Sequence, residues 1–191
     1  MPDTIYDVAI VGGGPGGYTA AFRAGQLGLK TCLIEKEDKL GGTCLHVGCI
    51  PTKALLFNAE VYDHLKAAEE YGIDGLGTGK LNWKNIQDRK NKIVTKHTKG
   101  LDFLVRKNKV DRVLGFGRLT GPAKNGVHTI QVESSKGASE VKAKNIIVAT
   151  GSYARMLPGL KADDRILTNI EVLSLPALPK SMVIIDQKSV V

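Results

Sequence analysis

The 191-residue sequence contains few cysteine and aromatic residues and no long hydrophobic segment. Three cysteines are too few for a disulfide-stabilised secreted scaffold. No apolar run approaches the roughly 20 residues that a membrane-spanning helix needs. Aromatic residues make up 5% of the chain and accompany no nucleic-acid-reading module. We therefore expect neither a membrane nor a nucleic acid as partner, and a composition rich in glycine and branched aliphatic residues predicts an α/β protein.

The N-terminus lacks a basic region followed by a long apolar segment, and an apolar strand begins within a few residues. Neither a secretory signal nor an amphipathic transit peptide is therefore expected in this sequence. The default expectation is a cytoplasmic protein, although a processed mitochondrial matrix protein would show the same features.

The net charge of +8 reflects many basic residues between positions 84 and 109, where apolar residues recur at helical spacing beneath them. This pattern predicts the solvated face of one or two long helices. Docking of an acidic partner domain is the alternative use of the same charge.

A glycine-rich loop follows the first apolar segment. Residues 5–11 are typical of a buried parallel strand, and the pattern G-x-G-x-x-G then places glycines at positions 12, 14 and 17. Gly12 permits a tight turn, Gly14 lets the backbone approach a pyrophosphate, and Gly17 lets the next helix pack on the strand. A helix over about 18–27 would direct its positive N-terminal end at the phosphates.

A second strand over residues 30–35 ends in Glu35, near the spacing at which an acid binds ribose hydroxyls. An acid here disfavours a 2′-phosphate, so an NADP-type ligand is not expected at this site. Strand, glycines, helix, strand and acid in this order predict a dinucleotide-binding domain. Cys32 on the second strand is interpreted as a small buried apolar residue.

Cys44 and Cys49 stand five residues apart, close behind the glycine-rich loop. In a protein without secretory features, such a pair indicates catalysis or metal binding rather than a structural disulfide. Cys32 and four scattered histidines do not complete a four-ligand zinc site, so no metal is predicted. A bridge closing so short a loop would add little stability. Beside a nucleotide motif, the pair predicts redox catalysis.

These residues together resemble the flavoprotein disulfide reductases. The resemblance rests on Val-Gly-Gly-Gly-Pro-Gly-Gly at 11–17, on Glu35, and on Gly-Gly-Thr-Cys-Leu-His-Val-Gly-Cys-Ile-Pro-Thr-Lys at 41–53, and it runs from about residue 6 to 185. Leu45 and residues 50–56 look most like the dihydrolipoamide dehydrogenases within the family. Mercuric and glutathione reductases carry a similar cysteine motif and remain alternatives. His46 departs from the usual asparagine and is either a residue that lowers a thiol pKa or a tolerated polar neighbour.

The resemblance implies an FAD-dependent oxidoreductase that oxidises protein-bound dihydrolipoamide and passes electrons through Cys44 and Cys49 and through FAD to NAD. Cys44 would be the exposed interchange thiol, Cys49 would hold the thiolate nearer the flavin, and Lys53 would face the flavin N5 region. A helix N-terminus after residues 41–43 would lower the thiol pKa values. The implied partners are the lipoyl domain of a 2-oxoacid dehydrogenase or glycine cleavage complex and a second subunit in a homodimer.

The resemblance also supplies candidate FAD contacts, residue by residue. Gly117 matches a main-chain position at the adenine end, and residues 150–152 match the segment that closes the flavin domain. The full set of predicted cofactor-binding residues is Gly12, Gly14, Gly17, Glu35, Lys36, Gly42, Thr43, Lys53, Gly117, Thr150, Gly151 and Ser152.

The remaining patterns predict the fold around these motifs. Residues 51–70 are expected to be helical, and 110–120, 126–134 and 139–144 alternate like antiparallel strands. Residues 145–152 return as a buried strand that ends in a small-residue turn. The expected architecture is a Rossmann-like FAD-binding domain over residues 1–152, with a parallel sheet and an inserted antiparallel β-meander.

Residues 153–191 are expected to form a linker and the start of a second nucleotide-binding domain, with a buried strand at 182–185. The family places a second glycine-rich loop after this strand to bind NAD, but the sequence continues Asp-Gln-Lys-Ser-Val-Val at 186–191. The second site is thus not intact, and no histidine matches the family's C-terminal acid–base residue. We expect the N-terminal part of a longer enzyme, inactive alone in NAD-linked turnover, or alternatively a non-catalytic flavin-binding fragment.

Overall fold

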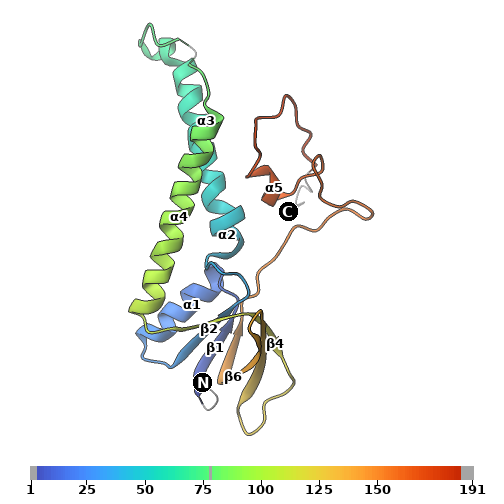
Figure 1. Cartoon of the computed structure of the whole chain (residues 1–191). Helices are drawn as coiled ribbons and strands as arrows, with labels where there is room; N and C mark the ends of the chain where they lie inside the picture. The colour runs from blue at the N-terminus through green and yellow to red at the C-terminus, as the bar shows by residue number, and fades with distance from the viewer. Residues whose placement is uncertain (1–3, 78, 186–191) are drawn as a thin grey trace, which may run out of the picture.

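The computed structural model describes residues 4–77 and 79–185. Within them, a sheet forms the base of the molecule and two long helices rise above it (Figure 1). The strands are β1 (Ile5–Val11), β2 (Thr31–Glu35), β3 (Asp111–Leu114), β4 (Phe116–Leu119), β5 (His128–Ser134) and β6 (Gly137–Val148). The helices are α1 (Pro15–Gln26), α2 (Gly42–Val47), α3 (Cys49–Lys66), the 3₁₀ helix η1 (Ala68–Tyr71), α4 (Trp83–Lys107) and α5 (Asn169–Val172).

The sheet has six strands in the order β3-β2-β1-β6-β5-β4. Strands β1, β2 and β3 run parallel, β6 pairs parallel with β1, and β5 pairs antiparallel with both β6 and β4. Helix α1 makes the crossover from β1 to β2, as parallel neighbours require. The predicted α/β class, with a parallel sheet core and an antiparallel meander, is confirmed.

The predicted strand boundaries in the meander are wrong in two places. The segment 110–120 is not one antiparallel strand: it divides at Gly115, whose φ is 152°, and only its second half is antiparallel, whereas β3 pairs parallel with β2. The predicted strands at 139–144 and 145–152 are one continuous β6, antiparallel to β5 and parallel to β1. The second part is also not buried as predicted, because Ile147 and Val148 are 40% and 62% exposed. Alternation reports which side chains are buried, but it carries no information on the direction of the neighbouring strand.

The core lies on both faces of the sheet. On one face, α1 covers β1 and β2 through a cluster that includes Ile10, Phe22 and Leu33. On the other face, alternate residues such as Val11 and Ile34 pack against strand β5. Strand β2 is buried along its whole length, as a central parallel strand covered on both sides should be.

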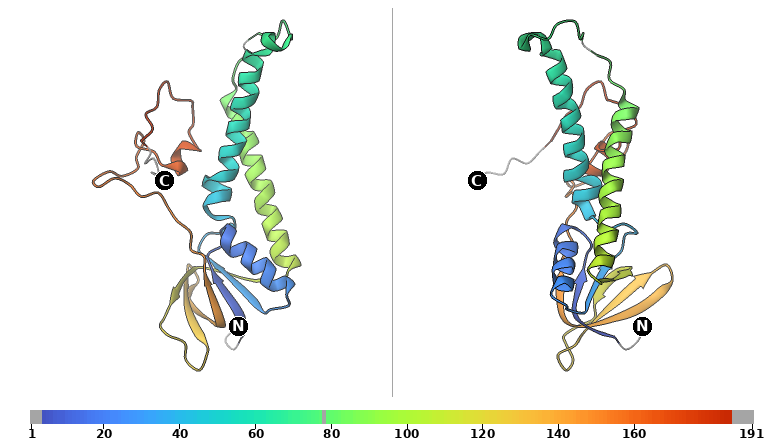
Figure 2. Two further views of the ribbon diagram at one scale, coloured as in Figure 1. Left: turned by 180° about the vertical axis from the view of Figure 1, so that it is seen from behind. Right: turned by 90° about the vertical axis from the view of Figure 1, so that its left-hand side faces the viewer.

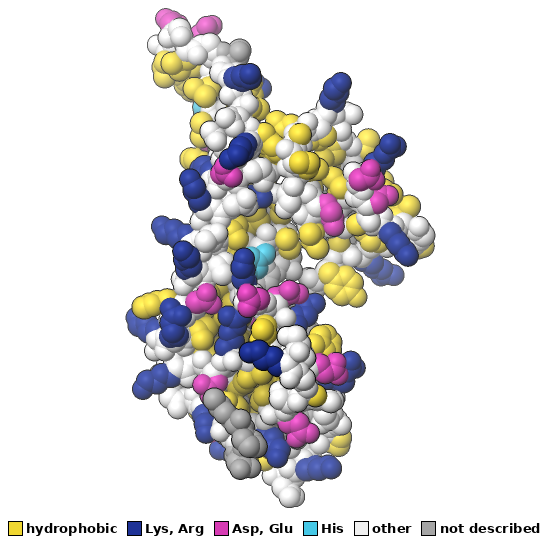
Figure 3. Space-filling view, in the orientation of Figure 1, with side chains coloured by type: hydrophobic (Ala, Val, Ile, Leu, Met, Phe, Trp, Pro, Cys, Tyr) yellow, Lys and Arg dark blue, Asp and Glu magenta, His cyan; other side chains and the backbone are white. Residues whose placement is uncertain are grey.

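Helices α3 and α4 form an antiparallel pair that projects from the sheet, as both views in Figure 2 show. Lys and Arg side chains lie along the outer edge of α4 (Figure 3), which confirms the predicted solvated helical face. Lys90 is the exception, because it is 5% exposed and its Nζ donates to the Leu173 carbonyl at 2.6 Å.

None of the helices among the described residues combines the length and apolar character needed to cross a bilayer.

The predicted buried strand at 182–185 is also wrong. These residues have no regular structure, and Val183 and Ile184 are 89% and 79% exposed. A buried strand needs hydrogen-bonded neighbours on its edges, and no strand of the described sheet pairs with this segment. The departure from a glycine-rich loop at 186–191 lies outside the described residues.

The first prediction compares two isoleucines that are register partners on adjacent strands. Ile10 on β1 is fully buried, whereas its partner Ile147 on β6 is 40% exposed. Ile10→Ala should lower the free energy of unfolding by about 2–5 kcal/mol, because it leaves a cavity in the core. Ile147→Ala should cost about 1 kcal/mol or less. Urea denaturation of both variants measures the difference, and equal losses would show that the α1-covered face is not the main core.

Candidate functional site

The predicted nucleotide-binding residues meet at one edge of the sheet, where the parallel strands β1, β2 and β6 end. The backbone N–H of Gly12 donates to the Ile34 carbonyl at 2.8 Å, and that of Ala149 donates to the Val11 carbonyl at 2.8 Å. These bonds place the glycine loop between Glu35 on one side and the turn after β6 on the other. Ligands of doubly wound sheets bind at this carboxyl edge.

Packing within the chain itself requires glycine at positions 12 and 17 of the loop, but not at position 14. Gly12 has φ 109°, and a Cβ there would clash with the Ala149 carbonyl; a Cβ on Gly17 would clash with the Gly12 carbonyl. A Cβ on Gly14, by contrast, would lie 3.8 Å from the Gly42 Cα, which is an ordinary contact. Because packing within the described chain leaves room for a side chain at Gly14, the glycine fits a backbone that a ligand approaches closely.

The N-terminus of α1 offers unsatisfied donors at the same place. Gly14 is its N-cap and provides no side-chain cap, and Pro15 occupies the first helical position. The first amides of a helix have no partners within it and carry a partial positive charge. The residues present therefore fit the pyrophosphate of FAD.

Glu35 holds the glycine loop in place. Glu35 is 9% exposed, and its carboxylate accepts from the Gly13 N–H at 2.6 Å and from the Glu37 N–H at 2.9 Å. The side chain of Lys36 is exposed, with its Nζ 3.8 Å from the Glu37 carboxylate. Contacts from Glu35 and Lys36 to a ribose stay predictions, but the structure gives Glu35 a second role in fixing the loop.

The segment that precedes the first cysteine joins the glycine loop to the turn after β6. A Cβ on Gly42, whose φ is 56°, would come within 2.7 Å of the Gly14 Cα, so the two loops touch backbone to backbone. The Thr43 hydroxyl donates to the Ser152 carbonyl at 3.4 Å. Thr150 adjoins Gly12 on the same side, since a Cβ on Gly12 would meet the Thr150 nitrogen at 3.0 Å.

Gly117 lies deeper than the other predicted contacts. A Cβ there would come within 3.2 Å of the Ile34 and Val11 side chains, so core packing alone accounts for the glycine. Gly151, with φ 77°, lies in the exposed turn. Contact of either residue with a cofactor stays a prediction.

The two cysteines lie on successive helices, Cys44 in α2 and Cys49 at the start of α3. Gly48 separates the helices, and a Cβ on it would approach the Thr43 oxygen to 2.8 Å and the Cys44 Cα to 3.2 Å. Only a glycine permits this close approach at the break between the two helices. Cys44 is half-buried and Cys49 is exposed, the reverse of the expected exposure.

The thiols interact directly. The pKa of Cys44 is raised, first by its hydrogen bond to the Cys49 thiol and then by burial, while the positive charge of Lys53 acts in the opposite direction. The prediction of a lowered pKa for Cys44 is therefore wrong. The hydrogen bond is the largest cause because it favours the protonated thiol, and the charge of the neighbouring sulfur adds to the same effect.

Cys32 is separate from this pair. It is fully buried on β2, and burial, with the nearby charge of Asp111, raises its pKa to about 12. This agrees with its interpretation as an apolar core residue. Across residues 4–77 and 79–185, no three His, Cys, Asp or Glu side chains gather as metal ligands.

His46 faces α4 rather than the thiols. Its Nε2 lies 2.9 Å from the Leu40 carbonyl, and its ring lines a cavity of about 640 Å³ against the helix. It is not among the groups that shift the pKa of Cys44, which favours the interpretation as a polar neighbour.

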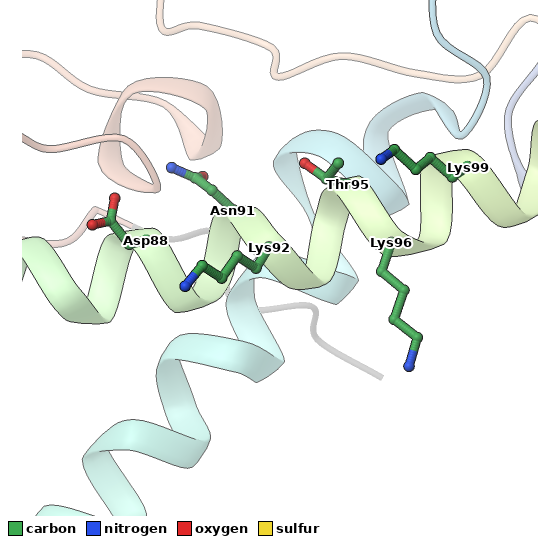
Figure 4. A pocket seen from close by; sticks show the side chains of 6 residues that line it. All are labelled: Asp88, Asn91, Lys92, Thr95, Lys96 and Lys99. Atoms are coloured by element: carbon green, nitrogen blue, oxygen red, sulfur yellow. The ribbon is translucent and has the colours of Figure 1, made fainter.

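A second, open hollow of about 560 Å³ lies along α4 (Figure 4). Its lining residues are Asp88, Asn91, Lys92, Thr95, Lys96 and Lys99. Neither hollow includes the thiols or the glycine loop, so the candidate redox site is an open edge of the described chain and not one of these cavities.

Two residues that the sequence did not single out, Tyr18 and Asn169, bear on the dithiol region. The pKa of Tyr18 is raised by burial and then by the charges of Cys44 and Cys49, so its phenol senses the pair electrostatically. Its position directly after Gly17 was an available signal. Asn169 donates from Nδ2 to the Val47 carbonyl at 2.7 Å, and no local pattern could have connected residues so distant in the chain.

Comparison with known proteins identifies close relatives. Over 187 residues the chain is 48% identical to a dihydrolipoyl dehydrogenase of Bacillus subtilis, covering 95% of this chain and 39% of that protein. It is 44% identical to a leghemoglobin reductase of Vigna unguiculata over 181 residues, covering 94% and 34%. The chain therefore spans less than two fifths of the length of these two relatives.

A solved structure and a family model agree with these relatives. The crystal structure of LpdA from Mycobacterium tuberculosis superposes with a TM-score of 0.78 at 29% identity, covering 90% of this chain and 38% of that one. The model of the family described as pyridine nucleotide-disulphide oxidoreductase matches residues 6–185. Since this match takes in nearly all of the sequence, the chain belongs to the pyridine nucleotide-disulphide oxidoreductase family.

Proposed function

We propose that this chain is the FAD-binding, dithiol-bearing part of a dihydrolipoamide dehydrogenase. The observation that carries the proposal is the contact between the segment leading to the cysteines and the glycine loop, through Gly42 and Gly14. This contact supports the proposal because it lies between the segment that carries the dithiol and the proposed dinucleotide site. Relatives named dihydrolipoyl dehydrogenase, at up to 48% identity, favour dihydrolipoamide over the substrates of mercuric or glutathione reductases.

The chemistry proposed for the chain's own residues is thiol–disulfide exchange. With Cys44 and Cys49 joined as a disulfide, a substrate thiolate attacks the Cys44 sulfur and displaces Cys49 as a thiolate. The second substrate thiol then displaces Cys44, so the substrate leaves as a disulfide and the protein retains the electron pair as a dithiol. The positive charge of Lys53 favours the anionic form of Cys44.

FAD, when bound, supplies a two-electron acceptor for the reduced dithiol. We propose that the uncapped amides of α1 hold its pyrophosphate, that Glu35 and Lys36 bind the ribose side, and that Gly117 contributes main-chain contacts at the adenine end. Thr43, Lys53 and residues 150–152 are proposed to face the flavin side. Their convergence at the carboxyl edge of β1, β2 and β6 supports this arrangement.

We further propose that the FAD-binding unit extends over residues 1–152 and that 153–191 lead to a second, NAD-binding unit. Strand β6 ends at Val148. Among the described residues after it, the short helix α5 is the only α-helix. In the complete enzyme, NAD would accept the electrons, a lipoyl domain of a 2-oxoacid dehydrogenase or glycine cleavage complex would deliver the substrate, and two chains would form a homodimer.

The second prediction tests the cofactor. Gly14 has φ −76° and ψ −174°, which a valine adopts readily, and its surroundings within the chain leave room for a side chain. Gly14→Val should therefore fold normally but weaken FAD binding by at least about tenfold, because the side chain excludes the pyrophosphate. Gly100→Ala, in open space on α4, is the matched control. The flavin absorbance per protein measures the effect, and undiminished FAD in Gly14→Val would refute the assignment.

The third prediction concerns the redox pair. In air-oxidised protein, Cys44 and Cys49 should resist alkylation under native conditions, and mild reduction should expose both. Cys32 should stay unreactive in either state, because burial and a raised pKa keep it a thiol. Mass spectrometry of alkylated protein counts the labels, with Cys44→Ser as the variant that cannot form the bridge. Full alkylation of both cysteines in the oxidised protein would contradict the redox function.

The fourth prediction concerns the effect of the Lys53 charge on the pKa of Cys44. Removing the positive charge of Lys53 should raise the pKa of Cys44 further, since that charge now favours the thiolate. Thiolate formation at Cys44 in Lys53→Met should accordingly require a higher pH than in the unaltered protein. The pH dependence of the alkylation rate of the reduced protein measures this, and Lys66→Met at the far end of α3 is the control. A pKa unchanged by Lys53→Met would place Lys53 outside the reach of the dithiol.

A further inference from the structure

The break between the two cysteine-bearing helices leaves one backbone carbonyl without its usual partner. In a continuous helix, the carbonyl of Val47 would accept from the N–H of residue 51. That residue is Pro51, which has no N–H. Pro51 is also among the most deeply buried residues of the chain. The sequence between the cysteines thus creates an acceptor that must be satisfied from elsewhere.

Asn169 supplies the missing donor from a segment 122 positions away in the sequence. Its Nδ2 lies 2.7 Å from the Val47 carbonyl oxygen, and the side chain is half-buried. Asn169 is the first residue of α5, which lies beside α2 (Figure 1). A reciprocal cap fixes this short helix: the Thr168 N–H donates to the Glu171 carboxylate at 2.7 Å, and the Ile170 N–H donates to the Thr168 hydroxyl at 3.2 Å.

Two further bonds hold the same segment against α4. The Lys90 Nζ donates to the Leu173 carbonyl at 2.6 Å, and the Trp83 Nε1 donates to the Leu175 carbonyl at 2.9 Å. Leu173 is itself 7% exposed. Asn169 therefore reaches the break from a capped helix whose following residues, Leu173 and Leu175, are bonded to α4.

We propose that Asn169 is a positioning residue for the Cys44–Cys49 pair, an inference that rests on the proposed redox function. A disulfide forms only when the two Cβ atoms approach within about 3.5–4.5 Å at a suitable angle. The relative placement of α2 and α3 sets that approach, and the bond from Asn169 to Val47 fixes the chain between the cysteines. With the bond in place, little freedom is lost when the sulfurs join; without it, closure must order the loop.

The test is the equilibrium of the purified 191-residue protein with dithiothreitol. In this exchange, the two thiols of the reduced pair lose two protons and two electrons as their S–S bond forms, and oxidised dithiothreitol takes them up as its own disulfide opens. Asn169→Leu keeps a similar volume without the donor and should lower the equilibrium constant for disulfide formation by about three- to tenfold, the value of one hydrogen bond. Ser174→Ala, an exposed change in the same segment, should leave it unchanged.

A purely structural role is separated by measuring urea unfolding of Asn169→Leu in the oxidised and the reduced state. If the residue only stabilises the fold, both states lose equal stability and the equilibrium constant does not move, which would overturn the proposal. A larger loss in the oxidised state supports it. If the unaltered protein forms no Cys44–Cys49 disulfide at all, the proposed redox function fails and this inference with it, a result distinct from an unchanged constant in a protein that does form the bridge.

Discussion

The close approach of three backbone segments at the carboxyl edge of the sheet is the constraint on which the rest of the site depends. Gly12 and Gly17 must lack side chains so that the loop, the first turn of α1 and the turn after β6 can touch. The same compactness brings Gly42 onto the loop and thereby fixes where the cysteine-bearing helices start. Binding surface and thiol pair are consequently parts of one packed unit, and neither can move without disturbing the other.

Electrostatics within this unit is set by neighbours more than by the helix ends. The Glu35 carboxylate accepts hydrogen bonds from two backbone amides, and the pKa of Cys44 is raised first by its hydrogen bond to Cys49. Most basic residues of α4 face solvent. Lys90 differs, because its buried ammonium group donates to the Leu173 carbonyl and to the Gln87 side chain at 2.5 Å. This lysine carries a lowered pKa because of its burial. Through its bond to the Leu173 carbonyl, Lys90 holds the segment that follows β6 against α4.

Much of this could be predicted from the sequence, because local patterns carry it. The G-x-G-x-x-G loop, the acid after β2 and the paired cysteines are short-range features whose geometry follows from backbone chemistry. The direction of strand pairing around Gly115 and the merging of two predicted strands into β6 depend on partners far along the chain, and alternation does not record them. The prediction of a buried strand at 182–185 was wrong for the same reason. A hydrophobic segment is stabilised by burial, but its sequence does not show whether a neighbouring strand is present to bury it. The roles of Tyr18 and Asn169 likewise arise from contacts that no local pattern encodes.

Pro51 has a consequence that reaches beyond the thiols. Because it has no amide N–H, a distant residue, Asn169, completes the hydrogen bonding of the chain between Cys44 and Cys49, and Asn169 belongs to the segment that follows β6. Thermodynamic coupling is reciprocal: to the extent that this segment favours one oxidation state of the sulfurs, that oxidation state favours the docked segment. Under the proposed redox function, reduction or oxidation of the two sulfurs would therefore change how firmly the segment that contains α5 is held against α2.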